Sequence, residues 1–374
     1  MGLIRTRFYQ PALPGDFVDR RRLIDQIDRG LDRPLTLVSA PAGFGKTVMV
    51  SSWLNRCSHP SAWLALDENI DDLTLFLPHF VAAIQTIDPD ALPRTEALLT
   101  GFDLPPIDVL AGSLINELDE IEGDFVIVLE DYHTLHAQEI HELLAALLHH
   151  PLPHMHLMLI SRRDPPLPLS VLRARNMVAE VRIQDLQFSA DEIAIFMQKV
   201  LGFPLPDDAI ADLVKRTEGW ITSLRLVALA LRYTDDIDNR LAALQGIDQN
   251  RYVADYLISE VLAQAGPELQ DFLLRTSILD RMSAPLCNAL LSPDIPDVDS
   301  QSTLAQLERH DLFTISLDSE RRWYRYHHLL QSFLRSQLER RYEADEVARL
   351  YDRASAWFAE HDLLEDALLY ALRG

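Results

Sequence analysis

A glycine-containing loop that ends in Gly-Lys-Thr is the part of this chain best suited to chemistry. The loop spans residues 40–47, follows an apolar, strand-like run at 35–39 and precedes a helical pattern at 48–55. The backbone N–H groups of such a loop, together with the N-terminus of the next helix, bind a polyphosphate. We expect Lys46 to be catalytic through contact with the β- and γ-phosphates, and the Thr47 hydroxyl to bind Mg²⁺.

The loop departs from the strict phosphate-loop (P-loop) pattern at one position, where Ala40 stands in place of the first glycine. Alanine is tolerated there if the position does not need a positive φ. A glycine-rich turn with an exposed lysine is the alternative interpretation, but the flanking strand and helix favour a nucleotide-binding loop. The residues expected to contact the nucleotide in this segment are Ala42, Gly43, Phe44, Gly45, Lys46, Thr47 and Val48.

Two acidic residues follow the most apolar strand-like run of the chain, 125–129. An uninterrupted apolar strand is typical of the centre of a parallel sheet, and the ligand of such a sheet lies at the carboxyl ends of its strands. We therefore assign Mg²⁺ binding to Glu130 and activation of the attacking water to Asp131, the candidate catalytic base. A helix-capping aspartate after a buried strand is the alternative for this position.

A further candidate closes the next strand-like run, 157–160, where Ser161 and Arg162 follow. A guanidinium at the carboxyl end of a strand could bind the γ-phosphate and act as its sensor, so Arg162 is a candidate catalytic residue. An ordinary surface arginine is the alternative, because Arg163 and Arg173 lie close by in the sequence.

The elements that would position these residues form two classes along the chain. Up to residue 187, five strands alternate with helices, which predicts a parallel, doubly wound α/β sheet. The expected strands are 35–39, 62–66, 125–129, 157–160 and 178–183, the expected helices include 73–87, 109–121 and 138–149, and 88–106 is expected to be a proline-punctuated loop.

From residue 188 the pattern becomes helical. Ser189 and Glu192 form a capping box that begins the new domain, with helices expected at 191–201, 207–215, 219–232, 252–264 and 268–276. Two strand-like runs, 312–317 and 323–326, lie between helical patterns and predict a winged-helix module. A tetratricopeptide-like helix pair is expected from 347 to 373, and such a pair needs further repeats to bury its apolar face, so the chain looks truncated. The expected domains are 1–187, 188–265, 266–340 and 341–374.

Composition restricts the classes of partner. The 374 residues include 34 basic and 57 acidic side chains and carry a net charge of −23, which opposes binding to nucleic acid by this segment. The two cysteines, Cys57 and Cys287, are far apart and indicate neither a disulfide framework nor a zinc site. Without a signal peptide or a long apolar run, the sequence indicates a cytoplasmic protein with no membrane partner.

Six strings of residues, taken in order, resemble the MalT-like, large ATP-binding regulators of the LuxR family, within the STAND class of P-loop NTPases. The resemblance covers nearly all of the chain. The strings are residues 39–47, 128–133, 161–166, 216–220, 272–279 and 323–330.

The resemblance implies roles for residues outside the P-loop. It implies that the strand before Arg162 lies between the P-loop strand and the acidic strand. It gives Val18 and Arg20 to the adenine-binding segment, Gly219 and Trp220 to a helical domain that covers the nucleotide, and His327 to the β-phosphate of ADP. A core histidine bonded to the backbone is the alternative for His327.

A nucleotide switch is the function that the resemblance implies. ADP would hold a closed resting state, and ATP would favour an open state that self-associates, with slow ATP hydrolysis as the reset. A small-molecule or protein inducer would act through C-terminal repeats, and DNA would be bound by a C-terminal helix-turn-helix, both beyond these residues. A non-hydrolysing, nucleotide-gated scaffold and a P-loop phosphotransferase are the alternatives.

Overall fold

The computed structural model describes residues 4–99, 104–232, 266–292, 294, 299–309, 314–318, 320 and 322–374. The chain divides into two compact units, Met1–Gln187 and Phe188–Gly374. The division falls at the residue where the helical pattern was expected to begin. The finer boundaries expected at 265 and 340 stay a prediction.

Unit 1 contains the five-stranded sheet that the sequence predicted. Its strands pair in the order β2-β3-β4-β1-β5, and every pairing is parallel. The strand before Arg162, β4, lies between the P-loop strand β1 and the acidic strand β3, as the family resemblance implied. The bounds are β1 Leu35–Ser39, β2 Ser61–Ala65, β3 Phe125–Glu130, β4 Met155–Ser161 and β5 Val178–Val181.

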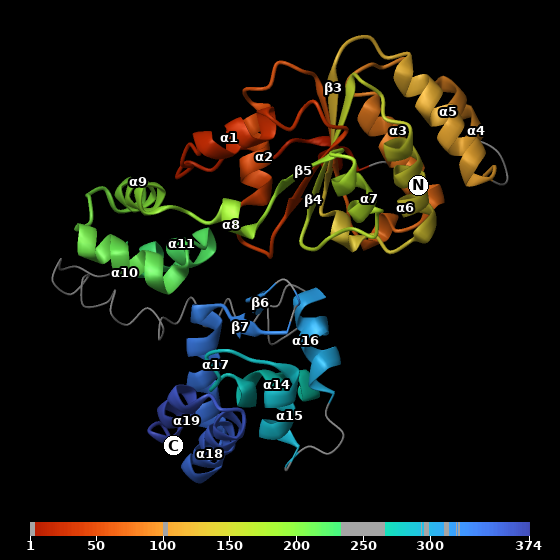
Figure 1. The fold of residues 1–374 in the computed structure, drawn as a ribbon. Coiled ribbons are helices and arrows are strands. Elements are labelled where there is room, and N and C mark those ends of the chain that lie inside the picture. Colours follow the sequence, from red (N-terminus) through yellow and green to blue (C-terminus); the bar gives the residue numbers. More distant parts are fainter. Residues whose placement is uncertain are drawn as a thin grey trace. The chain divides into compact units, whose positions relative to one another are not determined.

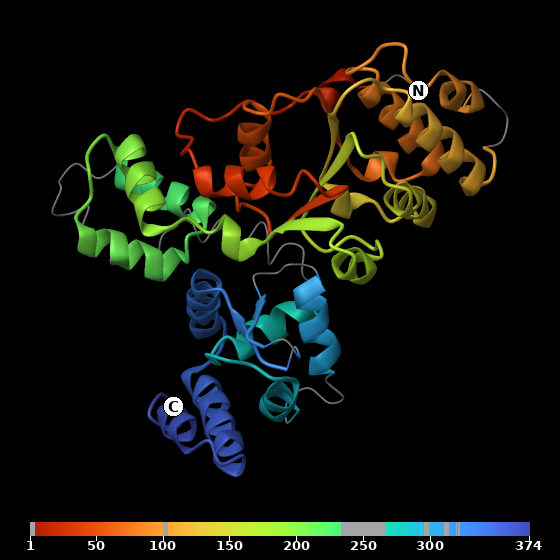
Figure 2. The ribbon, with the colours of Figure 1, turned by 45° about the horizontal axis from the view of Figure 1, so that its top comes forward.

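Helices cover both faces of this sheet, as the two ribbon views show (Figures 1 and 2). One face carries α1 (Arg21–Asp28) and the P-loop helix α2 (Lys46–Leu54). The other face packs against one continuous apolar core, to which strand residues such as Leu37 and Ile127 contribute. The helices on that side are α3 (Leu73–Ile84), α5 (Ile107–Asp119), α6 (Gln138–His149) and α7 (Leu169–Ala174).

Two expectations for the connections in unit 1 were wrong. The segment 88–106 is not only a loop, because it contains α4 (Pro93–Leu99). The buried Glu117 carboxylate on α5 accepts hydrogen bonds from the backbone N–H groups of Arg94 and Thr95, at 2.6 and 2.8 Å. This distant carboxylate caps the start of α4, so local sequence gave no signal for the helix. The last strand also ends earlier than expected, because residue 183 begins the short helix α8 (Ile183–Leu186).

Unit 2 begins with the predicted capping box, in which Ser189 and Glu192 each bond the other's backbone N–H, at 3.2 and 3.1 Å. The helix expected at 252–264 lies outside the described residues. The helix α15, at Ala284–Leu291, was not expected from the sequence. The described helices up to residue 291 are α9 (Ala190–Leu201), α10 (Asp207–Thr217), α11 (Ile221–Arg232), α14 (Pro267–Thr276) and α15 (Ala284–Leu291).

The expected winged-helix elements follow. An antiparallel pair of strands, β6 (Thr314–Ser316) and β7 (Tyr324–Tyr326), lies between α16 (Ser300–Arg309) and α17 (His328–Arg341). The final helix pair, α18 (Ala344–Glu360) and α19 (Leu364–Ala371), packs through Phe358 and Tyr370, whose ring centroids lie 5.1 Å apart. Leu364, Leu368 and Leu372 are exposed on the outer side of this pair.

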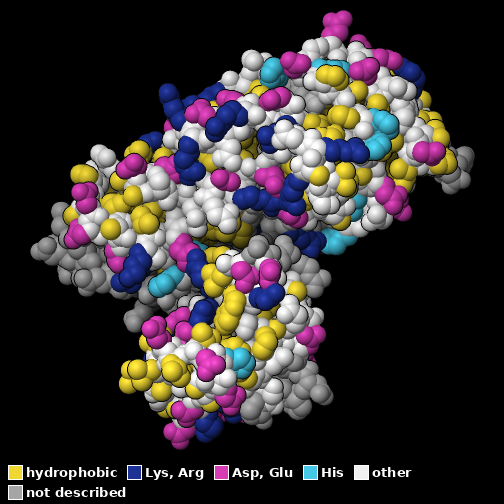
Figure 3. Space-filling view, in the orientation of Figure 1, with side chains coloured by type: hydrophobic (Ala, Val, Ile, Leu, Met, Phe, Trp, Pro, Cys, Tyr) yellow, Lys and Arg dark blue, Asp and Glu magenta, His cyan; other side chains and the backbone are white. Residues whose placement is uncertain are grey.

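On the face drawn in Figure 3, Lys and Arg side chains lie interspersed with Asp and Glu side chains. Within the described ranges, none of the helices combines the length and the apolar character needed to span a bilayer. The same residues contain no group of three or more His, Cys, Asp or Glu side chains arranged to hold a metal ion.

Candidate functional site

The loop between β1 and α2 has the backbone geometry of a phosphate-binding loop. Gly43 and Gly45 both adopt a φ of 77°, in the left-handed region that favours glycine. Gly45 is also the N-cap of α2, so the N-terminus of that helix faces the loop. Ala40 is not among the residues with a positive φ, which explains why alanine is accepted in place of the first glycine. Backbone N–H groups at such a helix start bind anions.

Lys46 is buried within the loop that precedes it. Its Nζ donates hydrogen bonds to the carbonyl oxygens of Ala40 and Pro41, at 2.6 and 2.9 Å. An ammonium group has three donors and no acceptor, so these bonds hold the positive charge on the inner side of the loop. The expected position of Lys46 at the phosphates stays a prediction, and the side chain is already at the loop where they would bind.

Thr47 and Glu130, the two expected Mg²⁺ ligands, are in direct contact. The Thr47 hydroxyl donates to Glu130 Oε1 at 2.6 Å, and the indole N–H of Trp63 donates to Glu130 Oε2 at 3.1 Å. Burial raises the pKa of Glu130, and the hydrogen bonds from Thr47 and Trp63 act in the opposite direction. Hydroxyl and carboxylate oxygens are the hard donors that Mg²⁺ prefers, and these two side chains are close together. The residues therefore fit Mg²⁺.

Asp131 follows Glu130 directly and adopts a left-handed backbone conformation, with φ at 55°. Its side chain is half exposed, and its Oδ1 lies 3.8 Å from Nδ1 of His133. Burial lowers the pKa of His133 to about 3, and the positive charges of Arg162 and Lys46 act in the same direction. His133 is therefore a neutral imidazole at neutral pH, next to the candidate base and near two other candidate residues. The sequence analysis had not assigned it a role.

Arg162 follows the last residue of β4, at the carboxyl edge of the sheet. Arg163 and Arg173 lie close to Arg162 in the sequence, which had made a surface role the alternative for Arg162. Each of the two has partners of its own. Arg163 donates to the carbonyl oxygen of His133 at 3.2 Å. Arg173 forms ion pairs with Glu180 and Asp164, at 2.8 and 3.0 Å.

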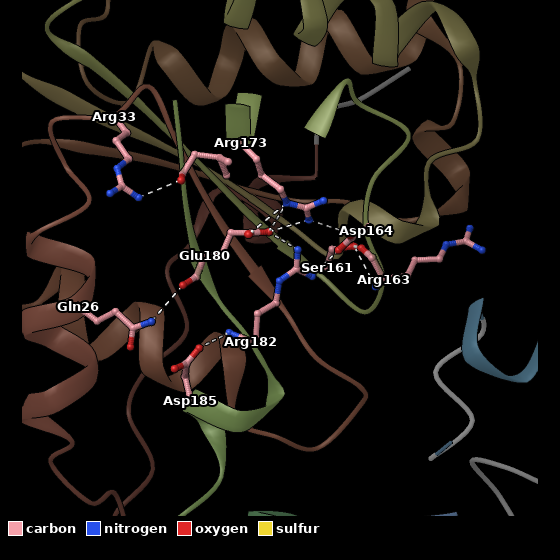
Figure 4. A network of polar contacts seen from close by, with 10 residues as sticks. Gln26, Arg33, Ser161, Arg163, Asp164, Arg173, Glu180, Arg182 and Asp185 are labelled. Carbon is pink, nitrogen blue, oxygen red and sulfur yellow. Dashed lines mark hydrogen bonds and ion pairs between the residues drawn. The ribbon is translucent and has the colours of Figure 1, made fainter. Parts of the chain in front are cut away.

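Figure 4 shows that Arg173 belongs to a charged network on the β5 side of the sheet. Arg182 joins the same two acidic residues, Asp164 and Glu180. Burial would raise the pKa of each of these carboxyl groups, but the hydrogen bonds from Arg182 and Arg173 keep both pKa values below their usual range. The network therefore has a structural role in joining the segment after β4 to β5.

The two residues expected to contact adenine, Val18 and Arg20, are both buried. The guanidinium of Arg20 donates to the carbonyl oxygen of Gln187 at 2.7 Å, and that of Arg22 donates to the same oxygen at 2.6 Å. These bonds join the start of α1 to the last residue of unit 1. Adenine binding by Val18 and Arg20 stays a prediction.

The candidate residues of unit 2 lie close to one another. Gly219 has a φ of 70° in the turn between α10 and α11, and its carbonyl oxygen accepts from the backbone N–H of Phe188 at 2.9 Å. The next residue, Trp220, is fully buried, and its ring packs edge-on against that of His327, with centroids 5.7 Å apart.

His327 is the N-cap of α17, where its Nδ1 accepts from the backbone N–H of Leu329 at 3.3 Å. Because Nδ1 accepts, the proton of the neutral ring is on Nε2. Burial lowers the pKa of His327 to about 4, while the Glu218 carboxylate and a hydrogen bond with the Thr217 backbone act in the opposite direction.

Sequence analysis missed Glu218 and Arg325, which form an ion pair beside His327. Arg325 donates from both terminal nitrogens to the two carboxylate oxygens of Glu218, at 2.8 and 2.7 Å. The backbone N–H of His328 donates to the same carboxylate at 3.0 Å. Burial would raise the pKa of Glu218, but the hydrogen bonds from Arg325 outweigh it and keep the pKa below its usual range.

Comparison with known proteins finds one domain model and several full-length relatives that match this chain. Residues 258–346 match the model of the MalT winged helix domain. The chain is 32% identical to the HTH-type transcriptional regulator MalT of Yersinia enterocolitica over 338 residues, which is 90% of this chain and 37% of that protein. It is also 32% identical to the serine/threonine-protein kinase PknK of Mycobacterium tuberculosis, over 97% of this chain and 32% of that protein. The chain thus spans about a third of the length of these relatives.

A solved structure supports the fold. The Walker-type ATPase PabY2304 of Pyrococcus abyssi matches with a TM-score of 0.60 and 15% identity, over 86% of this chain and 97% of that one. At this level of identity the likeness concerns the fold alone. Together with the parallel sheet and the P-loop, these matches show that the chain is a MalT-like protein with a P-loop NTPase fold and a MalT-type winged helix domain.

Proposed function

We propose that this chain is the nucleotide-dependent switch module of a MalT-like regulator, and that it binds ATP and ADP with Mg²⁺. The contact between Thr47 and Glu130 at the start of the P-loop helix is the observation that carries the proposal. It joins the P-loop to the acidic strand through the two groups that would bind the metal. Lys46 supports it, because its ammonium group is held at the loop where the phosphates would lie.

Slow ATP hydrolysis is part of the proposal. Mg²⁺, when bound by Thr47 and Glu130, would neutralise charge on the phosphates. Asp131 would accept a proton from the attacking water as the bond from the γ-phosphate to ADP breaks and inorganic phosphate forms. Lys46 and Arg162 would stabilise the negative charge on the transferred group. Asp131 is suited to this role because its carboxylate is half exposed and so accessible to water.

A regulatory role fits the relatives better than a phosphotransferase role. The same chain matches proteins named as transcriptional regulators and proteins named as kinases, at equal identity. We infer that it represents a module that both kinds share, and that the kinase activity in the second name belongs to another part of that protein. In this proposal DNA binding and inducer recognition likewise belong to parts beyond these residues.

Switching requires that ADP and ATP have different affinities for two conformations. In the proposal, ADP favours a closed resting state to which His327 contributes a hydrogen bond. ATP, with an inducer, favours an open state that self-associates, in the cytoplasm. Val18 and Arg20 would contact adenine, and Gly219 and Trp220 would cover the nucleotide. The buried pairing of Trp220 with His327 supports this, because it joins two of the proposed nucleotide-contacting residues in one cluster.

Three measurements test the proposal. Mass analysis of the nucleotide that copurifies with the protein should identify ADP or ATP, and titration of nucleotide-free protein should give binding that Mg²⁺ strengthens. Single-turnover assays with radiolabelled ATP should then show slow release of phosphate. Binding without hydrolysis would favour the non-hydrolysing scaffold, and a folded protein that binds neither nucleotide would overturn the proposal.

A further inference from the structure

The side chain of Trp63 is joined to the proposed metal site without being able to bind a metal. Trp63 lies on β2, which pairs with β3, and Ala65 of β2 lies opposite Glu130 in the register. The indole is buried, with 2% of its surface exposed, and its N–H donates to Glu130 Oε2. An indole nitrogen is a donor only, so its effect on a cation must pass through the carboxylate.

The Glu130 carboxylate needs such a partner because a glutamate side chain has three rotatable bonds. One oxygen accepts from Thr47 and the other accepts from Trp63, so the two donors together fix the plane of the carboxylate. The indole cannot rotate away easily, since it is part of the packed interior of the sheet. Without Trp63, the carboxylate could turn about its last bond and the position of Oε1 next to Thr47 would no longer be fixed.

We propose that Trp63 is a positioning residue for the Mg²⁺ site, in which its indole N–H fixes the Glu130 carboxylate so that the second oxygen stays beside the Thr47 hydroxyl. This inference rests on the proposed function, because it concerns the metal that accompanies the nucleotide. Partners that orient metal ligands in this way typically change metal affinity by about 10- to 100-fold when they are removed.

The first test is Trp63→Phe, which keeps an aromatic ring and removes the indole N–H. The affinity for ADP is measured by calorimetry in excess Mg²⁺ and in EDTA, and the ratio of the two affinities gives the Mg²⁺ enhancement. We expect the enhancement to fall by about tenfold while the affinity in EDTA changes less than about twofold. An unchanged enhancement in the folded variant would overturn the inference.

Trp53→Phe is the matched control. Trp53 lies on the P-loop helix itself, is fully buried, and its indole N–H also donates to a carboxylate, Oδ1 of Asp28, at 2.7 Å. The same substitution there removes the same kind of bond near the same loop, but away from Glu130. The Mg²⁺ enhancement should stay at the wild-type value in this variant. An equal fall in both variants would mean that Trp63 acts only through packing.

A double substitution tests whether the effect passes through Glu130. Asp is one methylene shorter, so in Glu130→Asp the carboxylate moves away from the indole. Adding Trp63→Phe to Glu130→Asp should then change the Mg²⁺ enhancement by less than about twofold. A further tenfold loss in the double variant would contradict the proposed route.

If Trp63→Phe does not fold, the wild-type protein provides the test. The indole N–H resonance that shifts in Glu130→Asp should also shift when Mg²⁺ is added to the ADP complex, and the resonance lost in Trp53→Phe should not. No shift on adding Mg²⁺ would overturn the inference. Failure of the proposed function is distinguishable, because the wild-type protein would then bind no nucleotide in either buffer.

Discussion

Arg325 and Glu218 lie 107 residues apart in the chain and form a two-pronged ion pair that connects the turn after α10 to the strand before α17. The pair is partly shielded from water, with 33% and 16% of the two side chains exposed. It lies beside the Trp220 and His327 rings, whose positions depend on the same two segments. We therefore expect the stability of unit 2 to depend on this ion pair.

Glu218→Gln should lower the free energy of unfolding of unit 2 by about 1–3 kcal/mol, because it leaves the Arg325 guanidinium without its charged partner. Chemical denaturation followed by Trp fluorescence measures the change. Glu320→Gln is the control, since Glu320 pairs with Arg322 at the surface, where 64% of the Glu320 side chain is exposed. Such exposed pairs contribute little, so the control should change stability by less than about 0.5 kcal/mol. Equal effects of the two changes would mean that the Glu218–Arg325 pair contributes no more to stability than an exposed ion pair.

Lys46→Ala should abolish detectable ATP binding, because it removes the cation that the P-loop itself contributes to the phosphates. Titration with ATP and Mg²⁺, with circular dichroism to confirm folding, measures this. Lys215→Ala provides the control, since Lys215 is exposed on α10. A folded Lys46→Ala variant with wild-type affinity would disprove the assignment of the P-loop.

Asp131→Asn should leave ATP binding nearly intact and slow hydrolysis by at least about 100-fold, because it removes a base and preserves the shape of the side chain. Asn also tolerates the left-handed backbone that Asp131 adopts, so the change adds little strain. Single-turnover hydrolysis is the measurement. An unchanged rate would exclude Asp131 from the mechanism.

His327→Ala should weaken ADP binding about tenfold or more and ATP binding less, because a hydrogen bond to ADP would be lost from the closed state only. His327→Asn separates this role from helix capping, since Asn is a good N-cap with a shorter side chain. His328→Ala is the control. Equal losses for ADP and ATP, together with lower thermal stability, would identify His327 as a core residue.

The low pKa of His327 also predicts a pH dependence. Since burial holds the pKa at about 4 in the folded state, against 6.5 in an exposed histidine, the unfolded state binds the proton first as the pH falls. The free energy of unfolding is therefore unaffected by His327 above pH 6.5 and falls as the pH drops from 6.5 toward 4, by up to about 3 kcal/mol. Hydrogen exchange of α17, compared with His327→Asn at each pH, should show this loss in the wild type only. Parallel behaviour of the two proteins would contradict it.

The sheet and the P-loop could be predicted from the sequence because their signals are local. An apolar run, a Gly-Lys-Thr loop and a helix adjoin in the chain, and β3 is an apolar strand that ends at Glu130 and is followed by Asp131. The helix α4 could not be predicted in this way, since its cap, Glu117, comes from another helix.

The partners of the predicted site residues were missed for the same reason. A tryptophan within an apolar strand has the pattern of any core residue, so nothing marked the bond from Trp63 to Glu130. The pairing of Glu218 with Arg325 depends on folding that brings distant segments together. His133 was within reach of the sequence analysis, because it follows Asp131 by two residues, but its low pKa depends on burial in the folded protein and, to a smaller extent, on the charges of Arg162 and Lys46.

The placement of β4 has a mechanical consequence. Along its length β4 is bonded to β1 on one side and to β3 on the other, and Ser161, the residue before Arg162, lies opposite Ser39, which directly precedes the P-loop. The strand cannot slide without breaking main-chain bonds on both sides. Arg162 therefore follows a strand that is held on both sides. In the proposed function, its distance from the P-loop would be fixed, and the two together would distinguish a nucleotide by its number of phosphates.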